Sequence, residues 1–123
     1  MRVLIAEDDN GSARLVSVIL KRMGLDTVTS VDGQTALDVS TQTRFDLILM
    51  DMNLPIIDGL TLARTIRERE KGSDRHVPII ALTGHAFPED RARCLAAGMD
   101  DYLTKPLTIE SLQERVRSWL GLD

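Results

Sequence analysis

Short apolar runs alternate with longer amphipathic segments along the whole chain. Each run has the length of a buried strand and is followed by polar or glycine-containing residues typical of a turn. The predicted strands are residues 3–6 (VLIA), 27–30 (TVTS), 47–50 (LILM), 78–82 (PIIAL) and 101–104 (DYLT).

The segments between these runs follow a helical period. In SARLVSVILKRMG, we expect Leu15 and Ile19 to share a face of the helix and Gly24 to end it. In the last segment, Thr108 is predicted to cap the start of a helix and Gly121 to end it. The apolar side of that last helix is predicted to consist of Ile109, Leu112, Val116 and either Trp119 or Leu120.

This alternation of strands and helices predicts an α/β fold. Parallel strands joined by right-handed crossovers place helices on both faces of a central sheet. The continuous apolar runs agree, because interior parallel strands are buried on both sides. No repeat, low-complexity tract or linker interrupts the pattern, so one domain is predicted over residues 1–123.

Composition narrows the possible environments and ligands. The net charge of −4 provides no basic field for nucleic acid, which argues against direct binding to it. The N-terminus lacks a secretory signal, and no window approaches the ~20 apolar residues of a membrane span. The single cysteine, Cys94, suits a reducing compartment and is predicted to pack as a small hydrophobe. We therefore predict a cytoplasmic protein that is not associated with membranes.

Polar side chains follow four of the five predicted strands. In open α/β sheets, ligands bind beyond the carboxyl ends of the strands, so these positions are the candidates for chemistry. Taken one at a time, such residues are commonly helix caps or turn residues, and Asp9 is predicted to be a cap. The residues that follow the strands are Glu7, Asp8 and Asp9, then Asp51, then Thr83 with Gly84, and finally Lys105 with Pro106.

Together these residues suggest phosphoryl chemistry. If the first and third strands are neighbours, Asp51 and the acids of the first loop share one pocket, and such close like charges require a cation. Mg²⁺ prefers oxygen ligands of this kind, and Lys105 can add a positive charge from about two strands away. An aspartate nucleophile, a metal, a lysine and the hydroxyl of Thr83 are the components of an acyl-phosphate site.

Four motifs give the chain a family resemblance. The segments AEDD, DLILMDMNLPIIDG, ALTG and DYLTKP resemble the receiver domain of two-component response regulators, and RCLAAGMDDYLTKPL resembles the receivers of hybrid histidine kinases. The resemblance implies a flavodoxin-like, doubly wound sheet of five parallel strands in the order 2-1-3-4-5, flanked by five helices. It implies a phosphoacceptor that assists its own phosphorylation and dephosphorylation, and not an enzyme acting on a separate substrate.

The resemblance also implies a role for each strand-end residue. Asp51 matches the phosphoacceptor, which receives its phosphoryl group from a sensor histidine kinase or a histidine phosphotransfer protein. Thr83 matches the switch hydroxyl, Lys105 the charge-neutralising lysine, and Tyr102 an aromatic residue that turns inward with Thr83. A downstream protein partner would bind the face formed by the fourth helix, fifth strand and fifth helix. The implied Mg²⁺ site consists of Asp8, Asp51, the backbone carbonyl of Asn53, and Glu7 acting through water.

Further loop residues match the same pattern. Pro55 and Gly59 fit the loop after the phosphoacceptor, where the glycine is expected to adopt torsions that other residues resist, and Lys105–Pro106 fits a cis peptide. His85, two residues after Thr83, either tunes dephosphorylation or lines a solvated loop. His76 is assigned to the loop before the fourth strand, with no role.

Two other functions compete with this interpretation. A haloacid-dehalogenase-like phosphohydrolase also uses an aspartate nucleophile, but Asn53 stands where its second, acid-catalytic aspartate would be. A receiver-like interaction module that is never phosphorylated is the other possibility. An EF-hand is excluded, because Ile56 occupies the position where that loop requires glycine.

Overall fold

Strands and helices alternate strictly along the structure. The computed structural model describes residues 1–84 and 87–122, so His85 lies outside the described residues. The strands are β1 (Arg2–Ala6), β2 (Asp26–Ser30), β3 (Leu47–Asp51), β4 (Ile79–Thr83) and β5 (Asp101–Thr104). The helices are α1 (Asn10–Arg22), α2 (Gly33–Gln42), α3 (Gly59–Glu70), α4 (Pro88–Ala96) and α5 (Ile109–Leu120).

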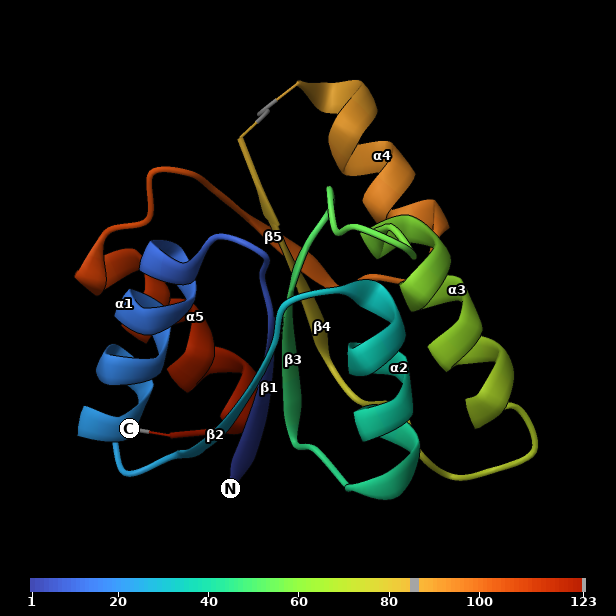
Figure 1. Cartoon of the computed structure of the whole chain (residues 1–123), viewed down its shortest axis with the longest axis horizontal. Coiled ribbons are helices and arrows are strands. Elements are labelled where there is room, and N and C mark those ends of the chain that lie inside the picture. Colours follow the sequence, from blue (N-terminus) through green and yellow to red (C-terminus); the bar gives the residue numbers. More distant parts are fainter. Residues whose placement is uncertain (85–86, 123) are drawn as a thin grey trace.

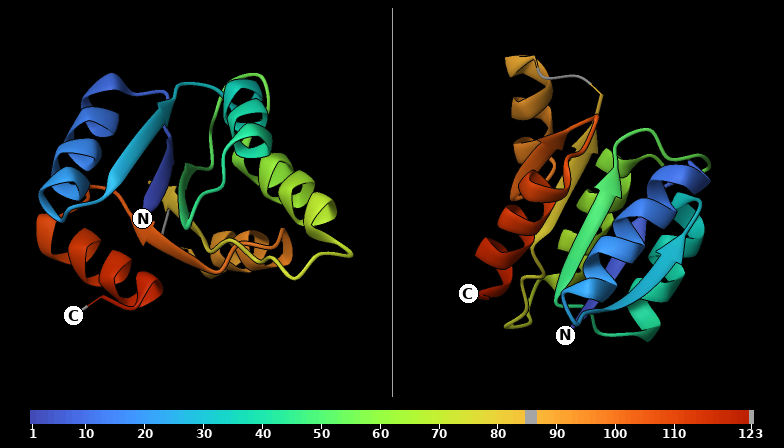
Figure 2. Two further views of the ribbon diagram at one scale, coloured as in Figure 1. Left: turned by 90° about the horizontal axis from the view of Figure 1, so that it is seen from below. Right: turned by 90° about the vertical axis from the view of Figure 1, so that its left-hand side faces the viewer.

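The strands form one parallel sheet in the order β2-β1-β3-β4-β5. Helices α1 and α5 cover one face, and α2, α3 and α4 cover the other (Figures 1 and 2). The doubly wound, flavodoxin-like fold is therefore confirmed. Because every strand is parallel, the carboxyl ends of all five lie at the same edge of the sheet, which brings the strand-end residues together.

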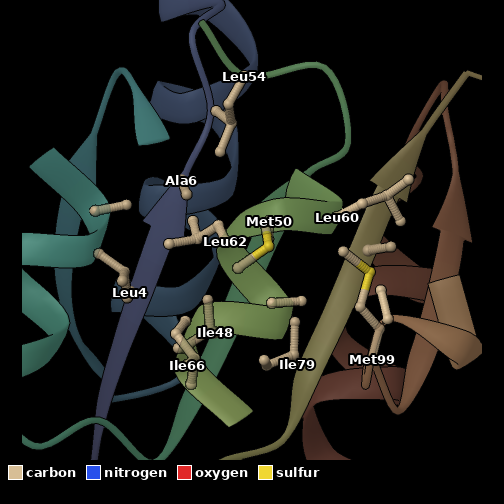
Figure 3. Packing of buried hydrophobic residues seen from close by; sticks show 14 of the residues in the cluster. Leu4, Ala6, Ile48, Met50, Leu54, Leu60, Leu62, Ile66, Ile79 and Met99 are labelled. Carbon is tan, nitrogen blue, oxygen red and sulfur yellow. The ribbon is translucent and has the colours of Figure 1, made fainter. Parts of the chain in front are cut away.

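Alternating side chains divide the core into two layers. In β1, Val3 and Ile5 pack beneath α1 and α5, whereas Leu4 and Ala6 pack beneath α2 and α3 (Figure 3). All five residues of β3 and of β4 are buried. Each fully buried Leu or Ile contributes about 1.5–3 kcal/mol of transfer free energy, so these two strands are the most stably held part of the sheet.

Most predicted helix features are confirmed, with two corrections. Thr108 accepts a hydrogen bond from the backbone N–H of Ser111, as a cap should, and the last helix ends at Gly121. Leu15 and Ile19 were predicted to share a face of the helix, but Ile19 is buried whereas the side chain of Leu15 is 47% exposed. Ile109 is also exposed.

Both corrections follow from helix geometry. The buried face of α1 is centred one residue beyond Leu15, and Ile109 is the first residue of α5, whose buried residues are Leu112 and Val116. The face of α1 that does pack on the sheet consists of Ala13, Val16, Ile19 and Leu20. Within residues 1–84 and 87–122, no helix has the length and apolar character of a membrane span.

Candidate functional site

The carboxyl edge of the sheet gathers the predicted site residues. Ala6 of β1 pairs with Met50 of β3, so Glu7 and Asp51, the residues that follow, lie at the same level on neighbouring strands. Thr83 ends β4 on the other side of β3, and it is buried. The sheet order therefore juxtaposes side chains that are far apart in sequence.

Lys105 joins these strands electrostatically. Its Nζ lies 3.0 and 3.1 Å from the two carboxylate oxygens of Glu7 and 3.2 Å from Oδ2 of Asp51. The lysine thus reaches from the end of β5 across β4 to both β3 and β1. The prediction placed Glu7 at a metal through water, whereas in this structure both of its oxygens contact the Lys105 amine directly.

Burial and charge shift the acid–base properties of this pair. Burial raises the pKa of Glu7, which is fully inaccessible, and the nearby charge of Asp51 raises it further, while Lys105 opposes both. Burial alone would lower the pKa of Lys105, but hydrogen bonds and charges from Glu7 and Asp51 outweigh it, so that pKa is raised. The lysine therefore stays protonated and supplies a permanent positive charge.

Asp51 is held from two sides. It is 6% exposed; its Oδ1 accepts a hydrogen bond from the backbone N–H of Asn53 at 3.0 Å, and its Oδ2 contacts Lys105. Asp8 is exposed, and one carboxylate oxygen each from Glu7, Asp8 and Asp51 lie within 4.8 Å of one another. Hard oxygen donors gathered this closely are the ligand set that suits Mg²⁺.

The loop after Asp51 packs closely against the end of β3. Gly59 was predicted to supply unusual torsions, but its φ is not positive; instead, a Cβ there would lie 2.8 Å from Met52 Cα and clash with the Asp51 carbonyl oxygen. Space, not torsional freedom, therefore requires glycine. The residue of this loop with positive φ is Ile56 (71°), and the Lys105–Pro106 peptide is cis as predicted.

Two other predicted residues have defined surroundings. Tyr102 is half-buried on β5, with the guanidinium carbon of Arg91 5.5 Å from its ring centroid. Asp9 caps α1 by accepting a hydrogen bond from the backbone N–H of Ser12 at 2.8 Å. Hydrogen bonds from the side chain and the backbone of Ser12 lower the pKa of Asp9. The predicted cap is thereby confirmed, and Asp9 is separated in role from Glu7 and Asp8.

Helix α4 borders the site through sulfur atoms. Cys94 is the buried residue of this helix, and its Sγ lies 3.3 Å from Sδ of Met52, the residue after Asp51. Burial raises the pKa of the Cys94 thiol, as expected for a thiol that packs as a hydrophobe. The position of α4 is therefore coupled by direct contact to the strand that carries Asp51.

A polar network lies at the opposite edge of the sheet, and the sequence did not predict it. His76, which was given no role, has its Nε2 2.7 Å from Oδ1 of Asp100, and Oδ2 of Asp100 accepts from Arg67. Arg67 and Asp100 are 33 residues apart, so no local spacing reveals the pair. The signal available in the sequence was the consecutive Asp100–Asp101 before a strand, where acids are unfavourable without partners.

Comparison with known proteins supplies independent evidence. The sequence matches the family described as response regulator receiver domain over residues 3–117. It is 38% identical over 122 residues to sensor protein GacS of Pseudomonas syringae pv. syringae, a match covering 98% of this chain and 14% of that protein. The chain therefore spans only a small part of that relative's length.

Solved structures show the same similarity. One is the receiver domain of sensor histidine kinase PA1611 from Pseudomonas aeruginosa PAO1, with a magnesium ion coordinated in its active site cleft (TM-score 0.87, 38% identity, covering 98% of this chain and 97% of that one). Another is the receiver domain of Ssk1 from Saccharomyces cerevisiae, co-crystallised with the histidine phosphotransfer protein Ypd1 (TM-score 0.90, 30% identity, covering 98% of this chain and 89% of that one).

Proposed function

This chain belongs to the response regulator receiver domain family of two-component systems, and on that basis we propose that residues 1–123 form a switch activated by phosphorylation of Asp51. The observation that carries the proposal is the contact of Lys105 with both Glu7 and Asp51. Apolar residues in place of this amine and the two buried acids would stabilise the fold at least as well. The arrangement of charges therefore points to a chemical role and not to a role in folding. The hydrolase alternative is not favoured, because the family match spans residues 3–117.

In the proposed reaction, a carboxylate oxygen of Asp51 attacks the phosphorus of a phosphohistidine. The new O–P bond forms as the N–P bond breaks, and the imidazole nitrogen leaves with the electron pair and takes up a proton. Lys105 stabilises the negative charge on the transferred group, and the backbone N–H of Asn53 orients Asp51. The same residues would position a water molecule whose oxygen attacks the phosphorus while the P–O bond to Asp51 breaks, which would release inorganic phosphate and restore the carboxylate. The domain would thus assist both its own phosphorylation and its own dephosphorylation.

The acidic cluster fits a divalent ion. We propose that Asp8, Asp51 and the backbone carbonyl of Asn53 bind Mg²⁺, which neutralises phosphoryl oxygens, with Glu7 contributing through water. The magnesium coordinated in the PA1611 receiver supports this assignment. Because Glu7 is already bound to Lys105, the exposed Asp8 is the acid most available to the ion.

Thr83 and Tyr102 would carry the change to the surface. Phosphorylation adds about one negative charge at neutral pH, and the Thr83 hydroxyl would move toward the new oxygens. Tyr102, half-buried beside Arg91, would then turn inward. This shifts an existing equilibrium toward a form in which α4, β5 and α5 bind a downstream protein.

The proposed phosphoryl donor is a sensor histidine kinase or a histidine phosphotransfer protein. The crystallised complex of the Ssk1 receiver with Ypd1 supports a donor of this class. A donor of that kind would act in the cytoplasm. The cytoplasmic location of this chain remains a prediction.

The test uses acetyl phosphate and Mg²⁺ with mass spectrometry of the intact protein. We expect one acid-stable, base-labile phosphoryl adduct, absent from Asp51→Asn and absent when Mg²⁺ is chelated. Asp58→Asn is the matched control, because Asp58 lies in the same loop but caps α3. An adduct that persists in Asp51→Asn would reject Asp51 as the acceptor, and no adduct on the wild-type protein would favour the non-phosphorylated interaction module.

A further inference from the structure

A cavity of about 350 Å³ opens between the C-terminal ends of α2 and α3 (Figure 1). The strand residue that lines it is Ile48, near the start of β3, whereas Asp51 ends the same strand. A ligand in this cavity would therefore not compete with a phosphoryl group on Asp51. The floor of the cavity is apolar and belongs to the core layer beneath the two helices, in which Ile48 and Ile66 are labelled in Figure 3. It consists of Phe45, Ile48, Ile66 and Val77.

The walls of the cavity are in place before any ligand binds. The apolar side chains of the floor are each at most 8% exposed and are held by the contacts of the core. The turn after α3 is held as well, because the hydroxyl of Ser73 donates to the Glu70 carbonyl at 2.6 Å and the guanidinium of Arg75 donates to the Phe45 carbonyl at 3.0 Å. A preformed cavity at the small end of the usual range suits a ligand of modest size, which can bind without ordering the chain.

The rim of the cavity carries positive charge that the protein does not pair. Arg69, in the last turn of α3, lines the cavity and has no hydrogen-bond or ion-pair partner among the described residues. Arg75 also lines it, and apart from the N–H that contacts a backbone carbonyl, its guanidinium has no partner within the part of the chain that the structure describes. Guanidinium groups with N–H donors to spare match the planar geometry of a carboxylate.

The negative groups next to the cavity are already paired. Glu70 is the acid among the lining residues; its Oε1 accepts from Arg67 at 2.6 Å, and its Oε2 accepts from the backbone N–H of Val77 at 2.8 Å. The C-terminal ends of the two helices carry partial negative charge, but their carbonyls also have donors. The Val39 carbonyl at the end of α2 accepts from the backbone N–H of Thr43, and that of Glu70 accepts the hydroxyl named above. The cavity therefore favours an anion over a cation.

We propose that this cavity binds a small carboxylate with an aromatic or branched aliphatic body, the body resting on the apolar floor and the carboxylate contacting Arg69 and Arg75. The inference goes beyond the proposed function and does not depend on it, since the cavity and the Asp51 site lie at opposite ends of β3. Burial of the apolar body supplies the affinity, whereas the two arginines select an anion over a neutral molecule of the same shape. Because Arg69 is exposed, solvent screens its charge and keeps this selection modest.

NMR spectroscopy of the whole chain tests this, with 3-phenylpropionate as the probe. In the wild-type protein we expect the backbone amide signals of residues 40–48 and 66–77 to shift saturably. The Kd should be on the order of 1 mM, an affinity typical of a ligand with about ten non-hydrogen atoms. The neutral 3-phenylpropionamide should bind about three- to fivefold more weakly, because it lacks the charge that the arginines recognise. Equal affinity for the two probes would contradict the proposal.

Arg69→Met separates recognition of charge from a structural role. The substitution keeps an apolar stem and removes the guanidinium, so we expect the carboxylate to lose about three- to fivefold in affinity while the amide loses none. If Arg69 only shaped the cavity, both probes would weaken by the same factor, and the proposal would fall. Arg64→Met is the matched control, because Arg64 is an exposed arginine of the same helix that does not line the cavity. It should bind both probes as the wild-type protein does.

Filling the cavity provides a second test. Thr41 is an exposed residue of α2 at the cavity wall, and in Thr41→Trp we expect the large side chain to occupy the space and abolish the shifts. Thr41→Ala leaves the space open and should retain them. Undiminished binding in Thr41→Trp would place the probe elsewhere on the molecule. If that variant does not fold, Arg69→Met decides the matter alone, since the Arg69 side chain has no partner to lose in the described structure.

Two further results would overturn the proposal. One is the absence of a saturable shift at residues 40–48 and 66–77 when the probe is present at about ten times the expected Kd. The other is a shift of the same signals when the protein is concentrated without probe, which would show that a second copy of the chain covers the cavity. Labelling of Asp51 by acetyl phosphate decides the proposed function separately, so the failure of either proposal leaves the other standing.

Discussion

The two edges of the sheet differ in how many positively charged partners their acidic side chains have. At the carboxyl edge, Glu7 and Asp51 share the amine of Lys105, with the exposed Asp8 close by. At the amino edge of β5, Asp100 and Asp101 each have an arginine of their own and further N–H donors. The first group has more negative charge than Lys105 can neutralise, whereas the carboxylates of the second group are each paired with an arginine. This difference fits the proposal that the first group is reactive and the second structural.

The pKa shifts express the same difference. For Glu7 the cost of burial prevails and its pKa is raised. Asp101 is also partly buried, but hydrogen bonds from Trp119 and Arg115 outweigh the burial, and its pKa is lowered. Partly buried carboxylates at the two edges therefore have pKa values shifted in opposite directions, and the excess negative charge at the carboxyl edge is what a bound metal ion can neutralise.

Removing the shared amine should have the largest effect. In Lys105→Ala, Glu7 and Asp51 face each other without a cation, and we expect a loss of about 2–3 kcal/mol in the free energy of unfolding at neutral pH, reduced from the fully buried case because the lysine is 28% exposed. Urea unfolding measures this. We also expect acetyl phosphate to label Asp51 still, while the hydrogen–deuterium exchange response of α4 to phosphorylation weakens.

A matched control for that variant is Lys71→Ala, since Lys71 pairs with Glu68 in full solvent and should contribute little. Equal losses of stability in the two variants would show that the fold depends no more on the charge of Lys105 than on a charge at the surface. A normal response of α4 to phosphorylation in Lys105→Ala would show that the switch does not need this lysine.

Neutralising the matched edge should have a smaller effect that depends on pH. Asp101→Asn should cost about 1–2 kcal/mol at neutral pH, because one oxygen that accepts from Arg115 or Trp119 is lost. The folded-state pKa of Asp101 is lowered, so its ionic contribution is present above the ordinary value of about 3.9 and is lost as pH falls through the folded value.

The difference between wild type and Asp101→Asn, followed by urea unfolding across pH, should therefore shrink in acid. Asp26→Asn provides the control, because Asp26 is the first residue of β2, as Asp101 is of β5, but is exposed. A difference that stays constant with pH would mean that Asp101 acts by shape and not by charge.

Magnesium should give the smallest effect and should act at one edge only. At a free concentration of about five times its Kd, Mg²⁺ bound to the folded protein alone adds about 1 kcal/mol to the free energy of unfolding. Asp8→Asn should remove this gain and change little without the ion, since Asp8 is exposed. Thermal unfolding with and without Mg²⁺ measures both, and an undiminished gain in Asp8→Asn would exclude that carboxylate as a ligand.

Much of the fold could be predicted from the sequence because it depends on local patterns. The apolar runs at 47–50 and 78–82 become β3 and β4 to within one residue, since strands buried on both faces need apolar side chains throughout. Given the strand order, the residues at the strand ends could be predicted to lie together at one edge of the sheet. That order came from the family resemblance, because alternation alone does not say which strands are neighbours.

What the sequence did not reveal depends on distant contacts. Arg67 looks like a surface residue of an amphipathic helix until the fold places Gly98 and Asp100 beside it. The reason for Gly59 was likewise mistaken, because a steric limit set by Met52 cannot be inferred from a glycine in a loop. Leu15 is the opposite case, because it is apolar and has helical spacing but lies exposed, away from the sheet.

The sulfur contact between Cys94 and Met52 makes α4 easy to observe. With 1% of Cys94 exposed and its thiol held protonated by burial, reagents in solution find no nucleophile while α4 is seated. Alkylation of Cys94 then requires α4 to move away from the sheet. Since Cys94 is the sole cysteine of the chain, the rate of its alkylation reports how often α4 opens, with no label added and no residue changed.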